Sequence, residues 1–176
     1  MTILQAYPGT IGDAISNVLI RGTRSEPMPK CNTSLNDARG DDRAIEYRFT
    51  GGSIIVSVTF DTPNWCFPVA QSLARVLQLE PNWDSYGGRP VNAHEAEGLL
   101  KLLRDVMGHS TPAPAIVPTN RGGVQAEWHR NGIDLEIETL RPSRFHVTFG
   151  DSDGIEWDAE VASDLSQLAP IIKRLS

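Results

Sequence analysis

The chain has 176 residues, of which 40% are hydrophobic and 22% are charged, and its formal net charge at pH 7 is −6. This length and composition predict one globular domain with a hydrophobic core. The acidic balance argues against direct binding of nucleic acid, which is driven by basic surfaces. The sequence has neither an apolar run of the roughly 18 residues that span a membrane nor a signal-peptide pattern, so we expect a cytoplasmic protein without a membrane partner.

The N-terminal part of the chain predicts an arm, residues 1–44, joined to a single α+β domain, residues 45–176. Within the arm, a short amphipathic helix is predicted by the spacing of four apolar residues, Ile11, Ile15, Val18 and Leu19. From 23 to 42 the composition shifts to Pro, Ser, Asn, Asp, Arg and Gly, which predicts a mobile polar loop.

Residues 45–60 predict a β-hairpin, because apolar and polar side chains alternate on both sides of Gly51-Gly52. Two adjacent glycines accept the positive φ angles of a type I′ turn. Pairing outward from that turn gives three apolar cross-strand pairs, Phe49 with Ile54, Tyr47 with Val56 and Ile45 with Val58.

Three later segments predict helices with an apolar stripe. The first begins near Pro68, where the missing N–H of proline is tolerated in the first turn. The second begins at Asn92, and Glu95 stands three residues on, which is the spacing of a capping box. The third, residues 163–175, contains Pro170, which we expect to kink or restart it.

A second hairpin is predicted around Asn131-Gly132, a strong signal for a type I′ turn, and it follows a short strand at residues 115–118. The cross-strand pairs are Arg130 with Ile133, His129 with Asp134, Trp128 with Leu135, Glu127 with Glu136, Ala126 with Ile137, and Gln125 with Glu138. One face of this hairpin is apolar and the other strongly acidic. Strands at 145–149 and 155–161 continue the alternation.

These elements together predict an α+β fold: a mostly antiparallel β-sheet built from hairpins, with about three helices packed on one face. The sequence leaves open the order of the strands and whether both hairpins share one sheet.

The acidic face of the second hairpin is the first candidate site, and its residues are Gln125, Glu127, His129, Asp134, Glu136 and Glu138. Directly opposed Glu127 and Glu136 destabilise a sheet unless a cationic group lies between them. That group is Arg144 or His146 from the next strand, another arginine, a divalent metal, or a basic residue of a partner. Three interpretations stay open: a solvated face, a protein-binding surface, or a metal or catalytic site.

Two glycine-containing segments form the second candidate site. The segment 82–90 holds Trp83, Asp84, Tyr86 and Arg89. Asp84 is suited to accept backbone N–H groups, and the two aromatic residues serve either as packing anchors or as part of a binding loop. The segment 119–123, which includes Arg121, has neither the Walker spacing nor a G-x-G-x-x-G pattern and leads into a strand, so it does not predict a nucleotide site.

Other catalytic patterns are weak. Cys31 and Cys66 have no disulfide or metal-binding spacing, and Cys66 is favoured as a core residue over a reactive thiol at a helix N-terminus. No cofactor and no dedicated metal site are predicted. Paired carboxylates suit general acid–base catalysis, but an open sheet face lacks the concave pocket that such catalysis prefers.

The two segments carry a family resemblance. The chain resembles a group of small bacterial proteins of unknown function that share the pattern NWDGYGAxP, a leucine-rich helix, PTxxGGVQLEW and DLEIE. The match covers roughly residues 79–138, about a third of the chain, and departs from the pattern at Ser85, Gly88 and Ala126. The resemblance supplies no activity or catalytic residues. It implies an accessory protein of a bacterium or phage, in a toxin–antitoxin or defence-related setting.

The leading functional prediction is a non-enzymatic protein that binds another protein with a basic surface, such as an antitoxin, an immunity protein or an inhibitor. One alternative is a small carboxylate-based enzyme, with or without a metal. A further alternative is an acidic mimic of nucleic acid, with the mimic charges on Glu127, Asp134, Glu136, Glu138, Glu156, Asp158 and Glu160. A homodimer is also left open.

Overall fold

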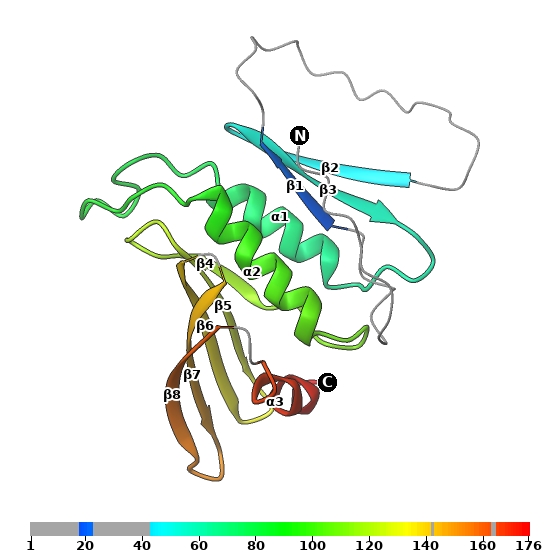
Figure 1. The fold of residues 1–176 in the computed structure, drawn as a ribbon, viewed down its shortest axis with the longest axis vertical. Helices are drawn as coiled ribbons and strands as arrows, with labels where there is room; N and C mark the ends of the chain where they lie inside the picture. Colours follow the sequence, from blue (N-terminus) through cyan, green and yellow to red (C-terminus); the bar gives the residue numbers. More distant parts are fainter. Residues whose placement is uncertain (1–17, 23–42, 142, 163–164) are drawn as a thin grey trace.

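The computed structural model describes residues 18–22, 43–141, 143–162 and 165–176. In this part of the chain the elements form two antiparallel sheets and three helices (Figure 1). Their bounds are β1 Val18–Gly22, β2 Arg43–Phe49, β3 Gly52–Val58, α1 Cys66–Val76, α2 Ala93–Val106, β4 Ala115–Pro118, β5 Val124–Arg130, β6 Ile133–Arg141, β7 Arg144–Asp151, β8 Glu156–Val161 and α3 Leu168–Arg174.

The two hairpins belong to separate sheets, and the helices α1 and α2 lie between them. One sheet has the strand order β1-β3-β2 and the other the order β4-β5-β6-β7-β8. Helix α1 contacts β2, β3 and β4, whereas α2 contacts β1, β5, β6 and α3. The buried side chains of both sheets and all three helices form one continuous hydrophobic core. The predicted α+β class with antiparallel pairing is confirmed.

The helix predicted near the N-terminus is wrong at residues 18–22, which form strand β1. Val18 and Ile20 pair with Val56 and Ile54 of β3, and Val18 is 2% exposed. A short apolar repeat is compatible with a helix or a strand, and here pairing with a buried strand decides between them. Ile11, Ile15 and the predicted mobile loop 23–42 lie outside the described residues.

The first hairpin forms as predicted, but its register is shifted by two residues. Tyr47 pairs with Ile54 and Ile45 with Val56, because the turn is made by Thr50 and Gly51. Gly51 has φ +92°, whereas Gly52 is already the first residue of β3 and lies against the backbone of Arg21. Since the shift is an even number of residues, the same apolar side chains still face the helices.

The second hairpin is confirmed in every predicted pair, from Arg130 with Ile133 to Gln125 with Glu138. Asn131 and Gly132 both have positive φ angles, of 54° and 68°, as a type I′ turn requires. The apolar face, with Trp128, Leu135 and Ile137, is buried against the helices. The acidic face is turned away from them.

The helix boundaries follow the local signals with two exceptions. Asn92 caps α2 through its side chain, which accepts a hydrogen bond from the His94 N–H at 2.9 Å. Glu95 does not complete the predicted capping box, since the Asn92 N–H donates instead to the carbonyl of Gly122. Helix α3 begins only at Leu168, so Pro170 lies in its first turn and produces no kink.

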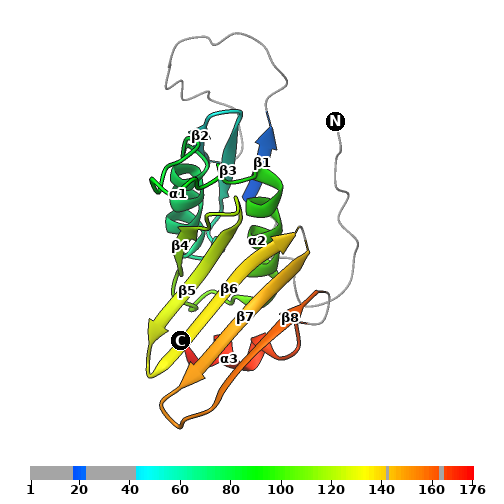
Figure 2. The ribbon, with the colours of Figure 1, turned by 90° about the vertical axis from the view of Figure 1, so that its left-hand side faces the viewer.

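The C-terminal helix α3 is tied to the turn ends of the five-stranded sheet. The Arg174 guanidinium donates to Asp151 at 2.9 Å and lies 5.9 Å from the ring centre of Phe149. Burial alone would raise the pKa of Asp151, but hydrogen bonds from Arg174 and from the Ile155 and Asp153 N–H groups lower it. These contacts fix α3 over one end of the apolar face (Figure 2).

Candidate functional site

The loop 82–90 between α1 and α2 is closed by hydrogen bonds from its own side chains. Asp84 Oδ1 accepts the N–H groups of Tyr86 and Gly88, both at 2.8 Å. Asn82 Oδ1 accepts the Gly87 N–H at 2.8 Å. The N–H groups of Tyr86 and Gly88 lower the pKa of Asp84, because they stabilise its charged form. The predicted role of Asp84 as an acceptor of backbone N–H groups is confirmed.

The two aromatic residues of this loop have different environments. Trp83 is half-buried, and its indole Nε1 donates to the carbonyl of Arg89 at 3.1 Å, so it holds the loop together. Tyr86 is 94% exposed and projects from the loop. Trp83 is therefore a packing anchor, whereas the side chain of Tyr86 makes no hydrogen bond to the described residues.

The loop 82–90 docks on the corner formed by residues 119–123. The Arg89 N–H donates to the carbonyl of Asn120 at 3.0 Å, and the Asn92 N–H donates to Gly122 at 2.9 Å. Gly122 has φ +88°, and a Cβ atom there would lie 2.9 Å from the carbonyl oxygen of Pro90. The two sequence motifs, far apart in the chain, thus form one structural unit that only glycine at this corner permits.

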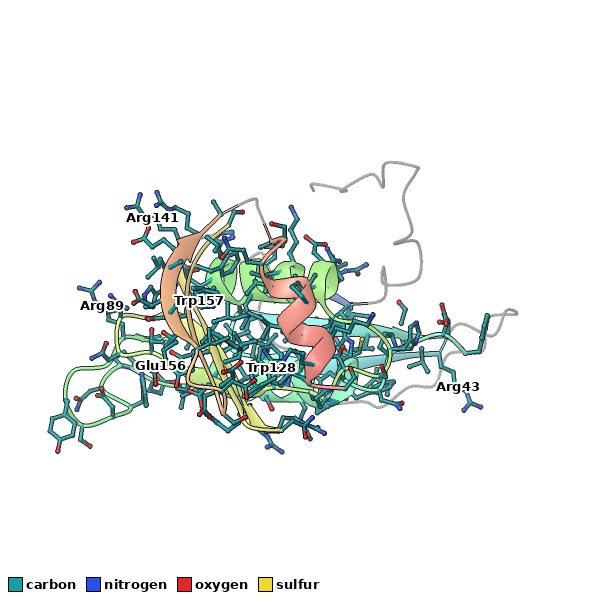
Figure 3. The ribbon with its side chains drawn as sticks, turned by 90° about the horizontal axis from the view of Figure 1, so that it is seen from below. Arg43, Arg89, Trp128, Arg141, Glu156 and Trp157 are labelled. Carbon is teal, nitrogen blue, oxygen red and sulfur yellow. The ribbon has the colours of Figure 1, made fainter. Side chains whose placement is uncertain are left out.

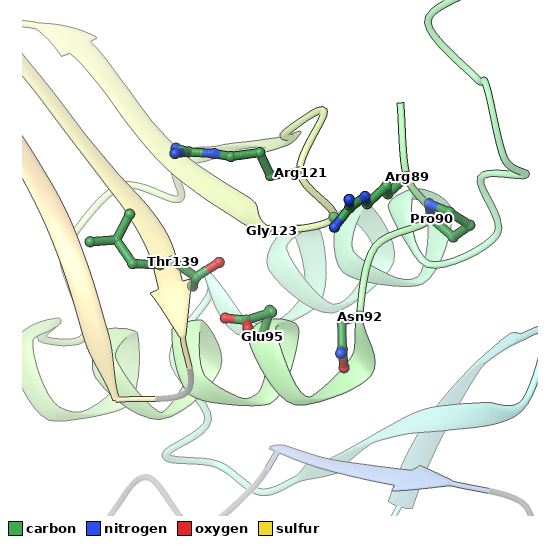
Figure 4. A pocket seen from close by; sticks show the side chains of 9 residues that line it. Arg89, Pro90, Asn92, Glu95, Arg121, Gly123 and Thr139 are labelled. Atoms are coloured by element: carbon green, nitrogen blue, oxygen red, sulfur yellow. The ribbon is translucent and has the colours of Figure 1, made fainter. Parts of the chain in front are cut away.

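A cavity of about 300 Å³ lies between this unit and the start of α2 (Figure 4). Its lining residues are Arg89, Pro90, Asn92, Glu95, Arg121, Gly122, Gly123, Thr139 and Leu140. The guanidinium of Arg121 is paired with Glu138 at 2.6 Å. That of Arg89 is exposed and has no ion-pair partner among residues 18–22, 43–141, 143–162 and 165–176.

Glu95 is the functional candidate that sequence reasoning missed. Its carboxyl group lines the cavity and lies towards Thr139 (Figure 4). The Oε2 atom is shielded from solvent and has no hydrogen-bond partner among the described residues. Burial raises the pKa of Glu95, and the Thr139 hydroxyl and the His94 charge oppose part of that shift. The sequence contains a signal for this position: Glu95 stands four residues before the buried Leu99, so both side chains lie on the same face of α2.

Thr139 holds the end of β6 to the corner. Its hydroxyl oxygen accepts the Val124 N–H at 2.9 Å and lies 3.1 Å from the Val124 carbonyl, where the backbone ladder between β5 and β6 has ended. The side chain therefore replaces a pair of ladder hydrogen bonds. It is buried, with 3% of its surface exposed.

Glu127 and Glu136 are bridged by a side chain of their own sheet face. The amide nitrogen of Gln125 donates to Glu127 Oε1 and to Glu136 Oε2, both at 3.0 Å. The expectation that Arg144 or His146 lies between these two carboxylates is wrong, because Arg144 pairs with Glu160 and His146 with Asp158. The amide of Gln125, with two N–H donors, occupies this place and gives one hydrogen bond to each carboxylate.

His129 and the outer strands balance further charges on the same face. His129 Nδ1 lies 2.8 Å from Asp134, and its Nε2 lies 3.5 Å from Glu127. The Asp134 carboxylate is the main cause of the raised pKa of His129, and Glu127 adds to it. The remaining ion pairs of this face are Arg144 with Glu160 at 2.6 Å and His146 with Asp158 at 3.3 Å.

The predicted site residues fall into two adjoining groups. Trp83, Asp84, Tyr86, Arg89 and Arg121 belong to the loop and the corner, and Gln125, Glu127, His129, Asp134, Glu136 and Glu138 lie on the acidic sheet face. The 2.6 Å ion pair between Arg121 and Glu138 joins the groups. No described element covers this face of the five-stranded sheet (Figure 2), and Arg89 and Glu156 lie on the same side of it, away from Trp128 and α3 (Figure 3).

Metal-dependent and cysteine chemistry find little support in the described residues. Within residues 18–22, 43–141, 143–162 and 165–176, no group of three or more His, Cys, Asp or Glu side chains is arranged to hold a metal ion. Cys66 is fully buried, and burial raises the pKa of its thiol to about 11, so it is a core residue, as the sequence favours. No helix of this part of the chain is long and apolar enough to cross a membrane.

Comparison of the chain with protein-family models, curated proteins and solved structures finds no significant match. A function is therefore inferred from the geometry of the two groups of residues described above.

Proposed function

We propose that the chain is a non-enzymatic binding protein that recognises another protein through one continuous surface. This surface, called the recognition face, consists of the loop 82–90, the corner 119–123 and the acidic face of β5 to β8. Its parts are physically joined, by the Arg89–Asn120 backbone hydrogen bond and by the Arg121–Glu138 ion pair. The loop projects on the side of the sheet that no described helix covers (Figures 1 and 2).

The observation that carries this proposal is the exposure of Tyr86 on a rigid loop. Asp84 and Asn82 hold the backbone on both sides of it, yet the tyrosine ring itself is 94% exposed. A tyrosine offers a large contact area and a hydroxyl group at low conformational cost, and such residues are frequent anchors of interfaces. Because the loop is already ordered, binding does not have to order it.

The charge of the recognition face favours a partner with a basic surface. Seven carboxylates lie on the sheet face, Glu127, Asp134, Glu136, Glu138, Glu156, Asp158 and Glu160. The arginines paired with them are Arg121 and Arg144. Asp134 and Asp158 have side chains that are 75% and 73% exposed, so their charges are available to steer a basic partner.

The biological setting is proposed from the sequence resemblance: a cytoplasmic accessory protein of a bacterium or phage that acts as an antitoxin, an immunity protein or a defence-related inhibitor. The carboxylate-based enzyme is less well supported, because Glu127 and Glu136 are bridged by Gln125 on an open sheet face. The acidic mimic of nucleic acid is a special case of the same proposal, in which the partner is a nucleic-acid enzyme with a basic groove.

The test is co-purification from cells that naturally produce the protein, followed by measurement of the affinity for the purified partner. Tyr86→Ala is expected to weaken binding at least tenfold, as truncation of an interface anchor does. Phe60→Ala is the matched control, since Phe60 is 104% exposed but lies in the turn after β3, outside the recognition face. Equal affinities of wild type and Tyr86→Ala would refute the proposed surface.

The charge contribution is measured separately with Asp134→Asn and Asp158→Asn. Both variants are expected to slow association at low salt, and the difference should fade as salt is raised. A partner that binds equally fast at all salt concentrations would contradict the basic-partner proposal, including the nucleic-acid mimic.

A further inference from the structure

The cavity between the loop 82–90, the corner 119–123 and α2 is lined by a guanidinium without an ion pair and by a carboxyl group with one oxygen that accepts no hydrogen bond from the described residues. The first is the guanidinium of Arg89, which is exposed and makes no ion pair with a described residue. The second is the carboxyl group of Glu95, whose Oε2 atom accepts no hydrogen bond from the described residues. Both residues line the same cavity, yet no ion pair joins them (Figure 4).

The rest of the lining narrows the chemistry of a ligand. Arg121 also lines the cavity, but Glu138 already neutralises its charge at 2.6 Å. One positive and one negative group therefore remain. A purely anionic ligand would meet Glu95, and a purely cationic one would meet Arg89. A ligand with both an anionic and a cationic group satisfies each of them, and it would also stabilise the charged form of a carboxyl group that burial disfavours.

The volume and the apolar lining of the cavity favour a small molecule as the ligand. The volume of about 300 Å³ is at the lower end of ligand pockets, and Pro90 and Leu140 add apolar atoms next to the polar groups. We propose that this cavity binds a free α-amino acid, whose carboxylate is held by Arg89 and whose ammonium group is held by Glu95. The cavity adjoins the recognition face, but the proposal does not rest on the protein-binding function, because Tyr86 does not line the cavity.

The experiment measures binding of the twenty common L-amino acids to the full-length protein, first by thermal shift and then by calorimetry. At about ten times its Kd, a true ligand is expected to raise the Tm by roughly 3 to 6 °C for a chain of this length. For each amino acid that binds, the N-acetyl derivative lacks the ammonium group and the amide derivative lacks the carboxylate. Both derivatives are expected to bind at least tenfold more weakly.

Variants then locate the site. Glu95→Gln and Arg89→Gln are each expected to weaken binding at least tenfold. Glu97→Gln, on the same helix, and Arg75→Gln, on α1, change the same residue types outside the cavity and are expected to bind like wild type. Arg89 is exposed, so Arg89→Gln tests the site even where Glu95→Gln alters the stability of the fold.

Three results would overturn the proposal: no amino acid binds, N-acetyl derivatives bind as well as free amino acids, or binding survives both cavity substitutions. Because Tyr86→Ala leaves the cavity lining unchanged, that variant is expected to keep full affinity for the amino acid. A failure of this proposal is thereby distinguishable from a failure of the proposed protein-binding function.

Discussion

Glu127 and Glu136 lie directly opposite each other on β5 and β6, and a single neutral side chain holds them together. The amide group of Gln125 donates one hydrogen bond of 3.0 Å to each carboxylate. A cross-strand pair of like charges is destabilising on its own, so the amide turns an unfavourable contact into a satisfied network. Such a network rigidifies the centre of the recognition face without giving it a positive charge.

Replacing Gln125 with methionine therefore tests the bridge directly. Gln125→Met keeps the length of the side chain but removes both donors, and it is expected to lower the free energy of unfolding by about 1–2 kcal/mol. In a Glu136→Gln background the cost should be smaller, because the like-charge repulsion is gone. Urea denaturation of the four proteins of this double-mutant cycle measures the coupling. If Gln125→Met lowered the free energy of unfolding equally in both backgrounds, Gln125 and Glu136 would not be energetically coupled.

The partly buried carboxyl group of Glu95 predicts a specific pH dependence of stability. Its ordinary pKa is 4.5, and burial raises the folded-state pKa above this value. Below pH 4.5 the group is protonated in both states and carries no penalty. As the pH rises, the unfolded chain releases its proton first, so the folded state loses stability until its own pKa is passed.

Glu95→Gln removes this penalty and is expected to be more stable than wild type at pH 7. The difference in Tm should disappear as the pH is lowered through 4.5. Glu97→Gln, at an exposed position of α2 outside the cavity, is the control for the substitution itself. A constant stability difference between Glu95→Gln and wild type from pH 3 to pH 8 would contradict the inferred burial of the charge.

The two glycine corners of the site predict a graded response to alanine. Gly87 and Gly122 have nearly the same φ angles, +91° and +88°, but only Gly122 has atoms within contact distance of an added Cβ. Gly87→Ala is expected to cost about 1–2 kcal/mol for the left-handed backbone alone. Gly122→Ala is expected to cost roughly 1–3 kcal/mol more, because its Cβ would press on Pro90. Denaturant titration of both variants checks the order.

The thiol of Cys66 is expected to be inert in the folded protein. With a pKa of about 11, only about one thiol in a thousand is ionised at pH 8, and the side chain is fully buried. In a Cys31→Ser background, modification by iodoacetamide should be far slower in native buffer than in urea, because it requires the unfolded state. Reaction at the rate of a free thiol in native buffer would contradict the buried position.

Much of the fold follows from local patterns, and the places where it does not have physical reasons. The hairpin around Asn131-Gly132 is fully predictable, because turn type and alternation specify the same register. The register of the first hairpin is not predictable in this way, because both Gly51 and Gly52 are acceptable in the turn. Gly52 belongs to β3 instead, where it packs against the backbone of Arg21 in the neighbouring strand β1. Strand β1 was missed for the same reason: its pairing with β3 is a long-range contact.

The candidate site shows a similar division. Contacts within one short segment can be predicted from the sequence. An example is Asp84, which accepts hydrogen bonds from the N–H groups of Tyr86 and Gly88. The sequence assigns Glu95 to a local capping box, but in the structure it lines a cavity together with Thr139, which lies on a strand more than forty residues later in the chain. The group that lies between Glu127 and Glu136 is the amide of Gln125. The alternation of apolar and polar residues places Gln125 on the acidic face but does not specify the direction of its side chain.

The helix layer between the two sheets also determines how the chain folds during synthesis. The strands β1 to β3 and both central helices emerge from the ribosome before residue 115, while the five strands of the second sheet follow. Until those strands arrive, apolar side chains of α2 such as Leu99 and Leu103, which are fully buried in the finished protein, lack their covering. The face of α2 that contacts β5 and β6 therefore becomes covered only after the hairpin around Asn131 and Gly132 has been synthesised.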